Sequence, residues 1–254
     1  MKNDDPFDKE RYAWATLYRP KKIDEMALPP SYKDEFLMIE DMGYMPNSII
    51  LHGTPGVGKT TIAEIFGSMP SYSFISYDCG ELNSKGHFQN IVKNITSSGL
   101  MSFFEGSTEK KRLIFLDEFN NISRASQQVL NKTMEQTAAH NTFIFATNNL
   151  EGLTPQLQNR CSLYRMNFAV IDAKTDKLEV FTKSHGMTKA EWIKELRRAA
   201  RLVGKKTKVK IPTSVFDDVE QNEENLVSVR GYMRAVSAGC MRHDYQIYKN
   251  KKTK

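Results

Sequence analysis

The residues with the clearest chemical meaning lie in one glycine-rich stretch. Its sequence, Gly53-Thr54-Pro55-Gly56-Val57-Gly58-Lys59-Thr60, is a complete G-x-x-x-x-G-K-[ST] motif. The glycines allow backbone N–H groups to curve around phosphate oxygens, and the helix that follows adds partial positive charge. We expect Lys59 to reach the β- and γ-phosphates of a nucleotide, the Thr60 hydroxyl to bind Mg²⁺, and Thr61 to belong to the same nucleotide site.

Two adjacent carboxylates follow an apolar run further along the chain. Leu113 to Leu116 reads as a buried strand, and Asp117 and Glu118 come directly after it. Asp117 would hold Mg²⁺ through water, and Glu118 would polarise the water that attacks the terminal phosphate. The alternative is that these two acids cap the next helix, because acidic side chains are favoured there. The complete phosphate-binding loop upstream favours the magnesium and water roles.

Three more polar residues are candidates for contacts to the phosphates. Asn148 follows the apolar run Phe143 to Ala146 and could contact the γ-phosphate or position the water, although Asn-Asn is also an ordinary turn pair. Arg160 is expected on a loop, from which an arginine can stabilise charge in a neighbouring subunit's site. Arg230, on the last predicted helix, could reach its own nucleotide. A lone arginine is more often a solvated surface charge, and the spacing does not decide between these interpretations.

These residues need a sheet to position them, and the hydrophobic pattern predicts one. Short apolar strands are predicted between helical stretches. The predicted strands are Ser48 to His52, Ser73 to Tyr77, Leu113 to Leu116 and Thr142 to Ala146; the predicted helices are 60–66, 87–98 and 126–135. Such alternation is typical of an α/β fold whose parallel sheet is covered on both faces.

The pattern changes after Phe168, where helical periodicity dominates. Helices are predicted over Lys174 to Ser184, Thr188 to Val203 and Ser228 to Met241, with no strong strand among them. The predicted organisation is an α/β domain over 1–168, a small helical domain over 169–245 and a basic, frayed tail over 246–254.

Composition narrows the function classes. The chain has 254 residues, a net charge of +6 and 40% hydrophobic residues, which suits a globular protein and permits an anionic partner such as nucleic acid. Its apolar runs are far shorter than the roughly 20 residues that a membrane helix needs, and no secretory signal opens the chain. The three cysteines form no C-x-x-C pair, so we expect neither a zinc site nor a disulfide framework. This use of cysteine is typical of a protein in a reducing compartment.

Taken in order, the motifs resemble those of the AAA+ ATPases, and within them the clamp-loader ATPase subunits, T-even phage members in particular. The resemblance covers roughly 13–240. The stretches that carry it are Tyr18-Arg19-Pro20 with Ile23-Asp24-Glu25, the run Ile49 to His52 leading into the glycine-rich loop, Asp117-Glu118-Phe119, Ser126-Gln127 with Met134-Glu135, Thr147-Asn148-Asn149, and Pro155 to Cys161.

The resemblance implies an AAA+ P-loop NTPase domain, RecA-like, followed by a helical lid, with ATP and Mg²⁺ as cofactors. It places Tyr18, Arg19 and Pro20 beside the adenine. Arg160 would be an arginine finger that acts in trans, although Asn159 stands where the family usually has serine. Arg230 would be the sensor on the lid. By position, Lys85 and Arg124 would face DNA, or else be solvated charges.

The resemblance also implies partners. These are a sliding clamp, a companion clamp-loader subunit and primer–template DNA, in a ring or spiral in the cytoplasm (of the host, if the chain is phage-encoded) and without a membrane. The resemblance leaves open which face touches the clamp, and the apolar stretch Met101 to Phe104 is one candidate. From the chain length, the collar domain of the family is expected to be absent from this sequence, whether it is missing from the lineage, supplied by another protein or removed. The alternatives are another AAA+ replication ATPase (a helicase loader or a branch-migration motor), a subunit that binds nucleotide without hydrolysing it, and a P-loop small-molecule kinase.

Overall fold

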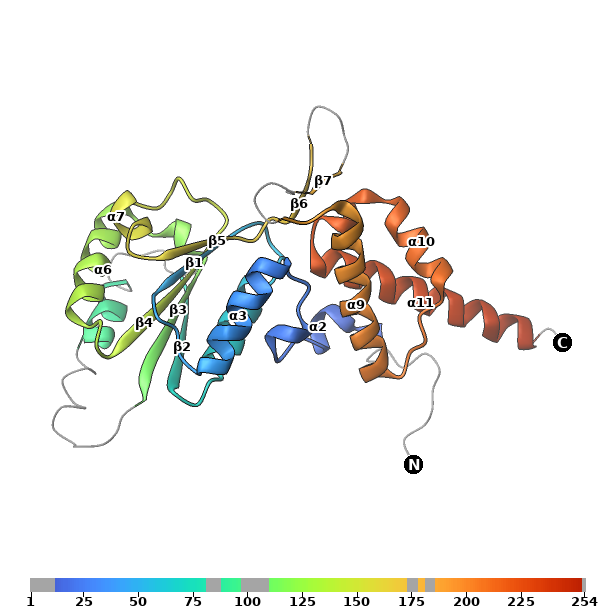
Figure 1. Ribbon diagram of the computed structural model, residues 1–254, viewed down its shortest axis with the longest axis horizontal. Coiled ribbons are helices and arrows are strands. Elements are labelled where there is room, and N and C mark those ends of the chain that lie inside the picture. Colours follow the sequence, from blue (N-terminus) through green and yellow to red (C-terminus); the bar gives the residue numbers. More distant parts are fainter. Residues whose placement is uncertain (1–11, 81–87, 97–109, 173–177, 181–185, 253–254) are drawn as a thin grey trace. The chain divides into compact units, whose positions relative to one another are not determined.

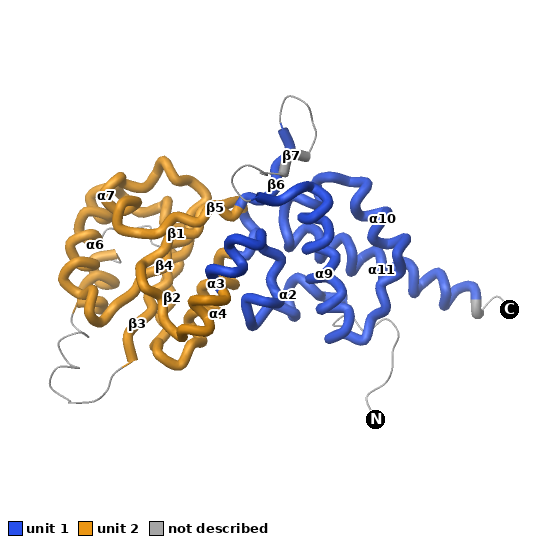
Figure 2. Tube along the Cα trace, in the orientation of Figure 1, with its two compact units in different colours: residues 1–36, 55–58, 167–254 blue, residues 37–54, 59–166 orange. Residues whose placement is uncertain are grey.

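The computed structural model describes residues 12–80, 88–96, 110–172, 178–180 and 186–252. The chain forms two compact units, coloured separately in Figure 2. The first comprises residues 1–36, 55–58 and 167–254, and the second comprises residues 37–54 and 59–166. Within the described ranges, no helix is long and apolar enough to cross a membrane.

The second unit is built on a five-stranded sheet. Its strands are β1 (Ile49–His52), β2 (Tyr72–Asp78), β3 (Lys111–Asp117), β4 (Asn141–Thr147) and β5 (Ser162–Arg165). They lie in the order β2-β3-β4-β1-β5, and every neighbouring pair is parallel. The prediction of a parallel sheet is confirmed. Sequence reasoning missed the edge strand β5, which has only four residues.

The core of this unit lies between the sheet and its helices. All seven residues of β4 are buried, and Phe143 and Phe145 pack in one cluster with Ile114 and Leu116 of β3. Helices α6 (Arg124–Gln136) and α7 (Pro155–Gln158) lie on one side of the sheet in Figure 1, and α4 (Lys59–Gly67) lies on the other side in Figure 2. A further helix, over 88–96, packs on the α6 side. Helices on both faces explain why the middle residues of the central strands, Leu113 to Leu116 and Phe143 to Ala146, are apolar without alternation.

One buried amide ties the loops of this unit together. Gln127 of α6 is fully buried, and its Nε2 donates to the carbonyls of Ile122 (3.0 Å) and Gly152 (2.9 Å). Its Oε1 accepts a hydrogen bond of 2.8 Å from the backbone N–H of Thr154. The segment after β3 and the segment after β4 are therefore both attached to α6.

The first unit is mainly helical. Its elements are α2 (Trp14–Leu17), η1 (Ile23–Glu25), the start of α3 (Pro30–Met42), α9 (Lys189–Thr207), α10 (Thr213–Gln221), η3 (Glu223–Leu226) and α11 (Val229–Lys252). Thr188 and Glu191 begin α9 with a capping box, because each side chain accepts the other's backbone N–H. Trp192, Phe216 and Tyr232, at most 1% exposed, form the centre of the core.

The C-terminal region differs from the sequence prediction in two places. Part of the predicted helix over 174–184 is wrong, because β7 (Leu178–Val180) pairs antiparallel with β6 (Ala169–Ile171). The sequence Leu178-Glu179-Val180 alternates apolar and polar residues, which is the period of a strand. Helix α11 continues to Lys252, through most of the segment that was predicted to be a frayed tail; lysines there suit the negative end of a helix dipole.

Residues 1–36 belong to the same compact unit as these helices. A compact unit is not the same thing as a domain, so the division of the chain near residue 168 stays a prediction.

Candidate functional site

The parallel register explains how three sequence motifs reach one edge of the sheet. β1 and β4 end side by side, with His52 opposite Thr147, and the N–H of Gly53 donates to the Thr147 carbonyl at 3.0 Å. β3 is the other neighbour of β4. The glycine-rich loop, Asn148 and the acidic pair therefore follow the carboxyl ends of three adjacent strands, which is the usual position for ligands in such sheets.

Lys59 is the first residue of α4 and is only 8% exposed. Its Nζ donates to the carbonyl of Gly53, to the carbonyl of Thr54 at 3.1 Å and to Oδ1 of Asn148 at 2.8 Å. A buried ammonium needs such acceptors. The structure thus brings together the loop lysine and the asparagine after β4, which are 89 residues apart in the sequence.

Thr60 and Asp117 form the second contact at this edge. The Thr60 hydroxyl donates to Oδ2 of Asp117 at 2.9 Å, and Oδ1 of Asp117 accepts the backbone N–H of Glu118 at 2.9 Å. A hydroxyl and a carboxylate are hard oxygen ligands of the kind Mg²⁺ prefers, so this pair fits the metal. No group of three His, Cys, Asp or Glu side chains in the described ranges could hold a metal ion. Thr60 and Asp117 would thus supply two oxygen ligands from the protein.

Glu118 has an unusual backbone conformation. Its φ of 49° lies in the left-handed region, which costs a non-glycine residue about 1–3 kcal/mol. It precedes η2 (Phe119–Asn121), but its side chain makes no capping hydrogen bond there. The exposed carboxylate instead accepts from Nδ2 of Asn121 at 3.4 Å. The capping alternative therefore does not account for Glu118.

The middle of the glycine-rich loop belongs to the first unit. Gly56 and Gly58 have φ angles of +87° and +106°, which favour glycine. The N–H of Arg230 in α11 donates to the carbonyl of Gly56 at 3.2 Å, and a Cβ on Gly56 would lie 3.0 Å from Cβ of Arg230. A Cβ on Gly58 would lie 2.8 Å from Cε of Met26. A Cβ at either glycine would therefore meet a neighbouring side chain in addition to the strain of a positive φ.

The other predicted nucleotide contacts are less closely grouped. Tyr18 ends α2, its N–H donating to the Trp14 carbonyl at 3.2 Å, and Arg19 and Pro20 follow it. Thr54 and Pro55 are exposed, whereas Val57 is buried; Thr61 lies in the first turn of α4. The structure places these residues without testing their roles. Met26, which sequence reasoning missed, packs against the loop without belonging to any motif.

Arg160 lies away from its own chain's phosphate-binding edge. It follows α7 and forms an ion pair with Glu135 of α6. Both line a hollow of about 320 Å³ together with Asn141, the first residue of β4. Asn141 and the carboxyl end of β4 are roughly 20 Å apart at the usual rise per residue of a strand. This position is unsuited to a contact with the chain's own nucleotide.

Of the residues predicted to face DNA, only Arg124 is described. It is the exposed first residue of α6, where the Ser123 side chain caps the helix by accepting the N–H of Ser126 at 3.2 Å. Lys85 and the segment Met101 to Phe104 lie outside the described residues.

Burial sets the ionisation of the nearby side chains. Burial, with smaller effects of Arg165 and Lys59, lowers the pKa of His52, which precedes the loop. Burial, together with Asp78, Asp117 and Glu118, raises the pKa of the Cys79 thiol to about 12. His52 is therefore neutral and Cys79 is protonated near neutral pH, so neither side chain adds charge at this edge of the sheet.

Residues 49–167 match the family of "ATPase family associated with various cellular activities (AAA)". This segment, which holds the glycine-rich loop, the acidic pair and Asn148, is therefore similar to AAA ATPase domains.

The curated relatives define the similarity more finely. The chain is 27% identical to the replication factor C small subunit of Methanocella arvoryzae over 157 residues, covering 60% of this chain and 47% of the relative. It is 30% identical to the sliding-clamp-loader large subunit of Enterobacteria phage T4 over 153 residues, covering 57% and 43%. The chain thus spans about half the length of these relatives.

A solved structure supports the fold along most of the chain. The Thermotoga maritima RuvB Holliday junction branch migration motor matches with a TM-score of 0.56 at 19% identity, covering 91% of this chain and 65% of that one. At this identity the likeness concerns the fold alone.

Proposed function

We propose that this protein is an ATPase subunit of a DNA sliding-clamp loader. In this proposal it uses ATP binding and hydrolysis, with Mg²⁺, to open a clamp and place it on primer–template DNA. The observation that carries the proposal is the grouping of Lys59 with Asn148 and of Thr60 with Asp117 at one edge of the sheet. The similarity to clamp-loader subunits supports clamp loading as the process that this ATP hydrolysis drives.

Each residue at this edge has a distinct role in the proposal. The N–H groups of Gly53 to Gly58 hold the phosphates, and the Lys59 ammonium exchanges its present oxygen partners for phosphate oxygens. Thr60 and Asp117 hold Mg²⁺, which neutralises charge on the phosphates when bound. Glu118 orients the attacking water and accepts its proton.

Asn148 contacts the γ-phosphate or that water. Thr61 completes the first turn of α4 at the phosphates. Tyr18, Arg19 and Pro20 lie beside the adenine.

The two arginines act on different nucleotides. Arg230, whose backbone contacts Gly56, senses the chain's own nucleotide from α11. Arg160 stabilises the transition state in an adjacent subunit, because it lies at the opposite end of β4 from Asn148. A site completed by a neighbour requires an assembled ring or spiral, with a companion clamp-loader subunit as a further member.

The proposed partners are the sliding clamp and the primer–template DNA, in the cytoplasm of the cell or of an infected host. Arg124 at the start of α6 offers a phosphate contact, since helix N-termini attract anions. Such contacts are independent of sequence and weaken with salt. Lys85 is proposed as a second contact of this kind.

The test is steady-state ATP turnover of the chain with companion proteins from the same genome, with and without primed DNA and clamp. We expect stimulation that requires both ligands. Glu118→Gln should lower kcat by about 100-fold or more, and Arg160→Ala by about 1,000-fold. Glu151→Gln is the matched control, because Glu151 is an exposed carboxylate on the turn after β4.

The other outcomes point elsewhere. Stimulation by DNA alone, with no effect of the clamp, would assign the chain to another AAA+ replication ATPase. A complex that binds ATP and never releases phosphate in a single turnover would be a scaffold. Full activity of Arg160→Ala in the assembled complex would refute the trans role.

A further inference from the structure

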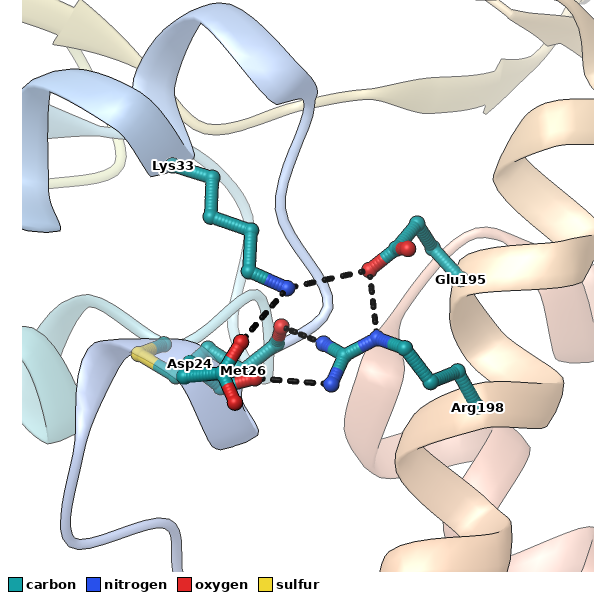
Figure 3. Close-up of polar contacts among 5 residues, drawn as sticks. All are labelled: Asp24, Met26, Lys33, Glu195 and Arg198. Atoms are coloured by element: carbon teal, nitrogen blue, oxygen red, sulfur yellow. Dashed lines mark hydrogen bonds and ion pairs between the residues drawn. The ribbon is translucent and has the colours of Figure 1, made fainter.

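Arg198 of α9 holds a stretch of backbone that is far away in the sequence. Its Nη1 donates to the carbonyl of Asp24 at 2.7 Å and its Nη2 donates to the carbonyl of Met26 at 2.5 Å (Figure 3). Its Nε donates to Oε2 of Glu195, one turn earlier in α9, at 3.0 Å. All three nitrogens of the guanidinium are thus engaged, two of them by main-chain oxygens.

The held segment, Asp24 to Met26, is fixed by other charges as well. Lys33 of α3 lies 3.4 Å from Oδ1 of Asp24 and 3.8 Å from Oε2 of Glu195 (Figure 3). Lys206, at the end of α9, donates to Oε1 of Glu25 at 2.6 Å. These contacts all lie within the first unit. Helix α9 therefore sets the position of this short segment.

The side chain of Met26 transmits this position to the phosphate-binding loop. Met26 is 5% exposed, and its Cε lies 2.8 Å from where a Cβ of Gly58 would be. Gly58 directly precedes Lys59 and has a φ of +106°. Packing against Met26 limits the conformations that this glycine can adopt, and a loop held in its binding conformation loses less entropy when a phosphate arrives.

We propose that Arg198 is a positioning residue of the nucleotide site. It fixes the carbonyls of Asp24 and Met26, so that Met26 holds Gly58 and the phosphate-binding loop is ordered before ATP binds. The inference rests on the proposed nucleotide site. Lysine cannot replace this arginine fully, since an ammonium is a point charge without the planar fork that spans two carbonyls and a carboxylate.

The test compares Arg198→Met, Arg198→Lys and the control Arg201→Met in the full chain. Arg201 is an exposed arginine on the same helix, and its guanidinium packs over the Phe216 ring of α10. The measurement is the Kd of a fluorescent ATP analogue, with KM and kcat for ATP in the assembled complex. We expect Arg198→Met to raise Kd and KM by about ten-fold, the effect of one charge-assisted hydrogen bond, with kcat at saturating ATP within about two-fold. Arg198→Lys should fall between, and Arg201→Met should match the unchanged protein.

A second variant separates positioning from folding. Met26→Ala keeps the carbonyls that Arg198 binds and removes only the contact with Gly58, so it should raise Kd in the same direction. Thermal unfolding of each variant checks that it is folded. An unchanged Kd in folded Arg198→Met or Met26→Ala overturns the proposal, and so does a fall in kcat that matches the rise in KM.

Lys59→Met distinguishes the two proposals. If this variant binds the ATP analogue normally, the proposed nucleotide site itself is wrong. If it loses binding while Arg198→Met keeps it, only the role of Arg198 is wrong.

Discussion

Replacing Gln127 with leucine should lower the stability of the second unit by about 3 kcal/mol. The substitution removes the hydrogen-bond partner of the Thr154 N–H and that of the Ile122 carbonyl. Thr154 and Ile122 are each 6% exposed, so neither group can easily turn to water instead. A buried group left without a hydrogen bond costs about 1–3 kcal/mol, and two such groups give the figure above. The Gly152 carbonyl adds less, since Gly152 is only partly buried and can reach water.

Urea unfolding followed by circular dichroism measures this loss. With an m value of about 1–3 kcal/mol per molar urea, a loss of about 3 kcal/mol should lower the midpoint by about 1–3 M. Both tryptophans, Trp14 and Trp192, lie in the first unit, so their fluorescence provides an internal reference for that unit. The control is Gln128→Leu, because Gln128 is the exposed neighbour of Gln127. A Gln127→Leu midpoint within the error of the control would refute the account of this amide.

Three further predictions concern other parts of the chain. Gly58→Ala should weaken nucleotide binding by about ten-fold or more in a fluorescence titration, because Gly58 has a positive φ and the new Cβ would meet Met26. Gly43→Ala is the control for backbone strain, since Gly43 also has a positive φ but open space around it. Tyr232→Phe should cost about 1–2 kcal/mol in urea unfolding, since its hydroxyl donates to Glu220 at 2.7 Å; an unchanged midpoint would contradict this. Folding lowers the pKa of His52 from 6.5. The contribution of neutral His52 to the free energy of unfolding should therefore be complete above pH 6.5 and decline as the pH falls below it. A His52→Gln variant with the same dependence of stability on pH would exclude this residue as the cause.

The parts of the site that lie in local motifs could be predicted from the sequence. The glycine-rich loop and the acidic pair each follow an apolar strand, and the carboxyl ends of parallel strands meet at one edge. Lys59 and Asn148 could therefore be assigned to one site before their contact was known. The order of the strands could be read only from their pairing in the structure, because no local sequence pattern predicts that β1 lies between β4 and β5.

The contacts that depend on distant parts of the chain could not be predicted. Arg198 and Asp24 are 174 residues apart, and an arginine in an amphipathic helix has no local feature that marks it as a ligand of main-chain oxygens. The edge strand β5 was missed because its four residues, of which only Tyr164 is buried, show little alternation of apolar and polar side chains. The strand Leu178–Val180 was missed because its three residues were included in a longer helical pattern.

Helix α11 connects two distant points of the first unit. It begins at Val229, next to the backbone contact between Arg230 and Gly56, and runs for 24 residues, which makes it about 36 Å long. Near its other end, Oδ2 of Asp244 accepts a hydrogen bond of 2.6 Å from the Tyr12 hydroxyl. If α11 tilted as a rigid rod by about 10° about Arg230, its far end would move by roughly 6 Å, about the height of one helical turn. Such a tilt would break the contact between Tyr12 and Asp244, so this hydrogen bond at the far end restrains the angle at which the helix meets the loop.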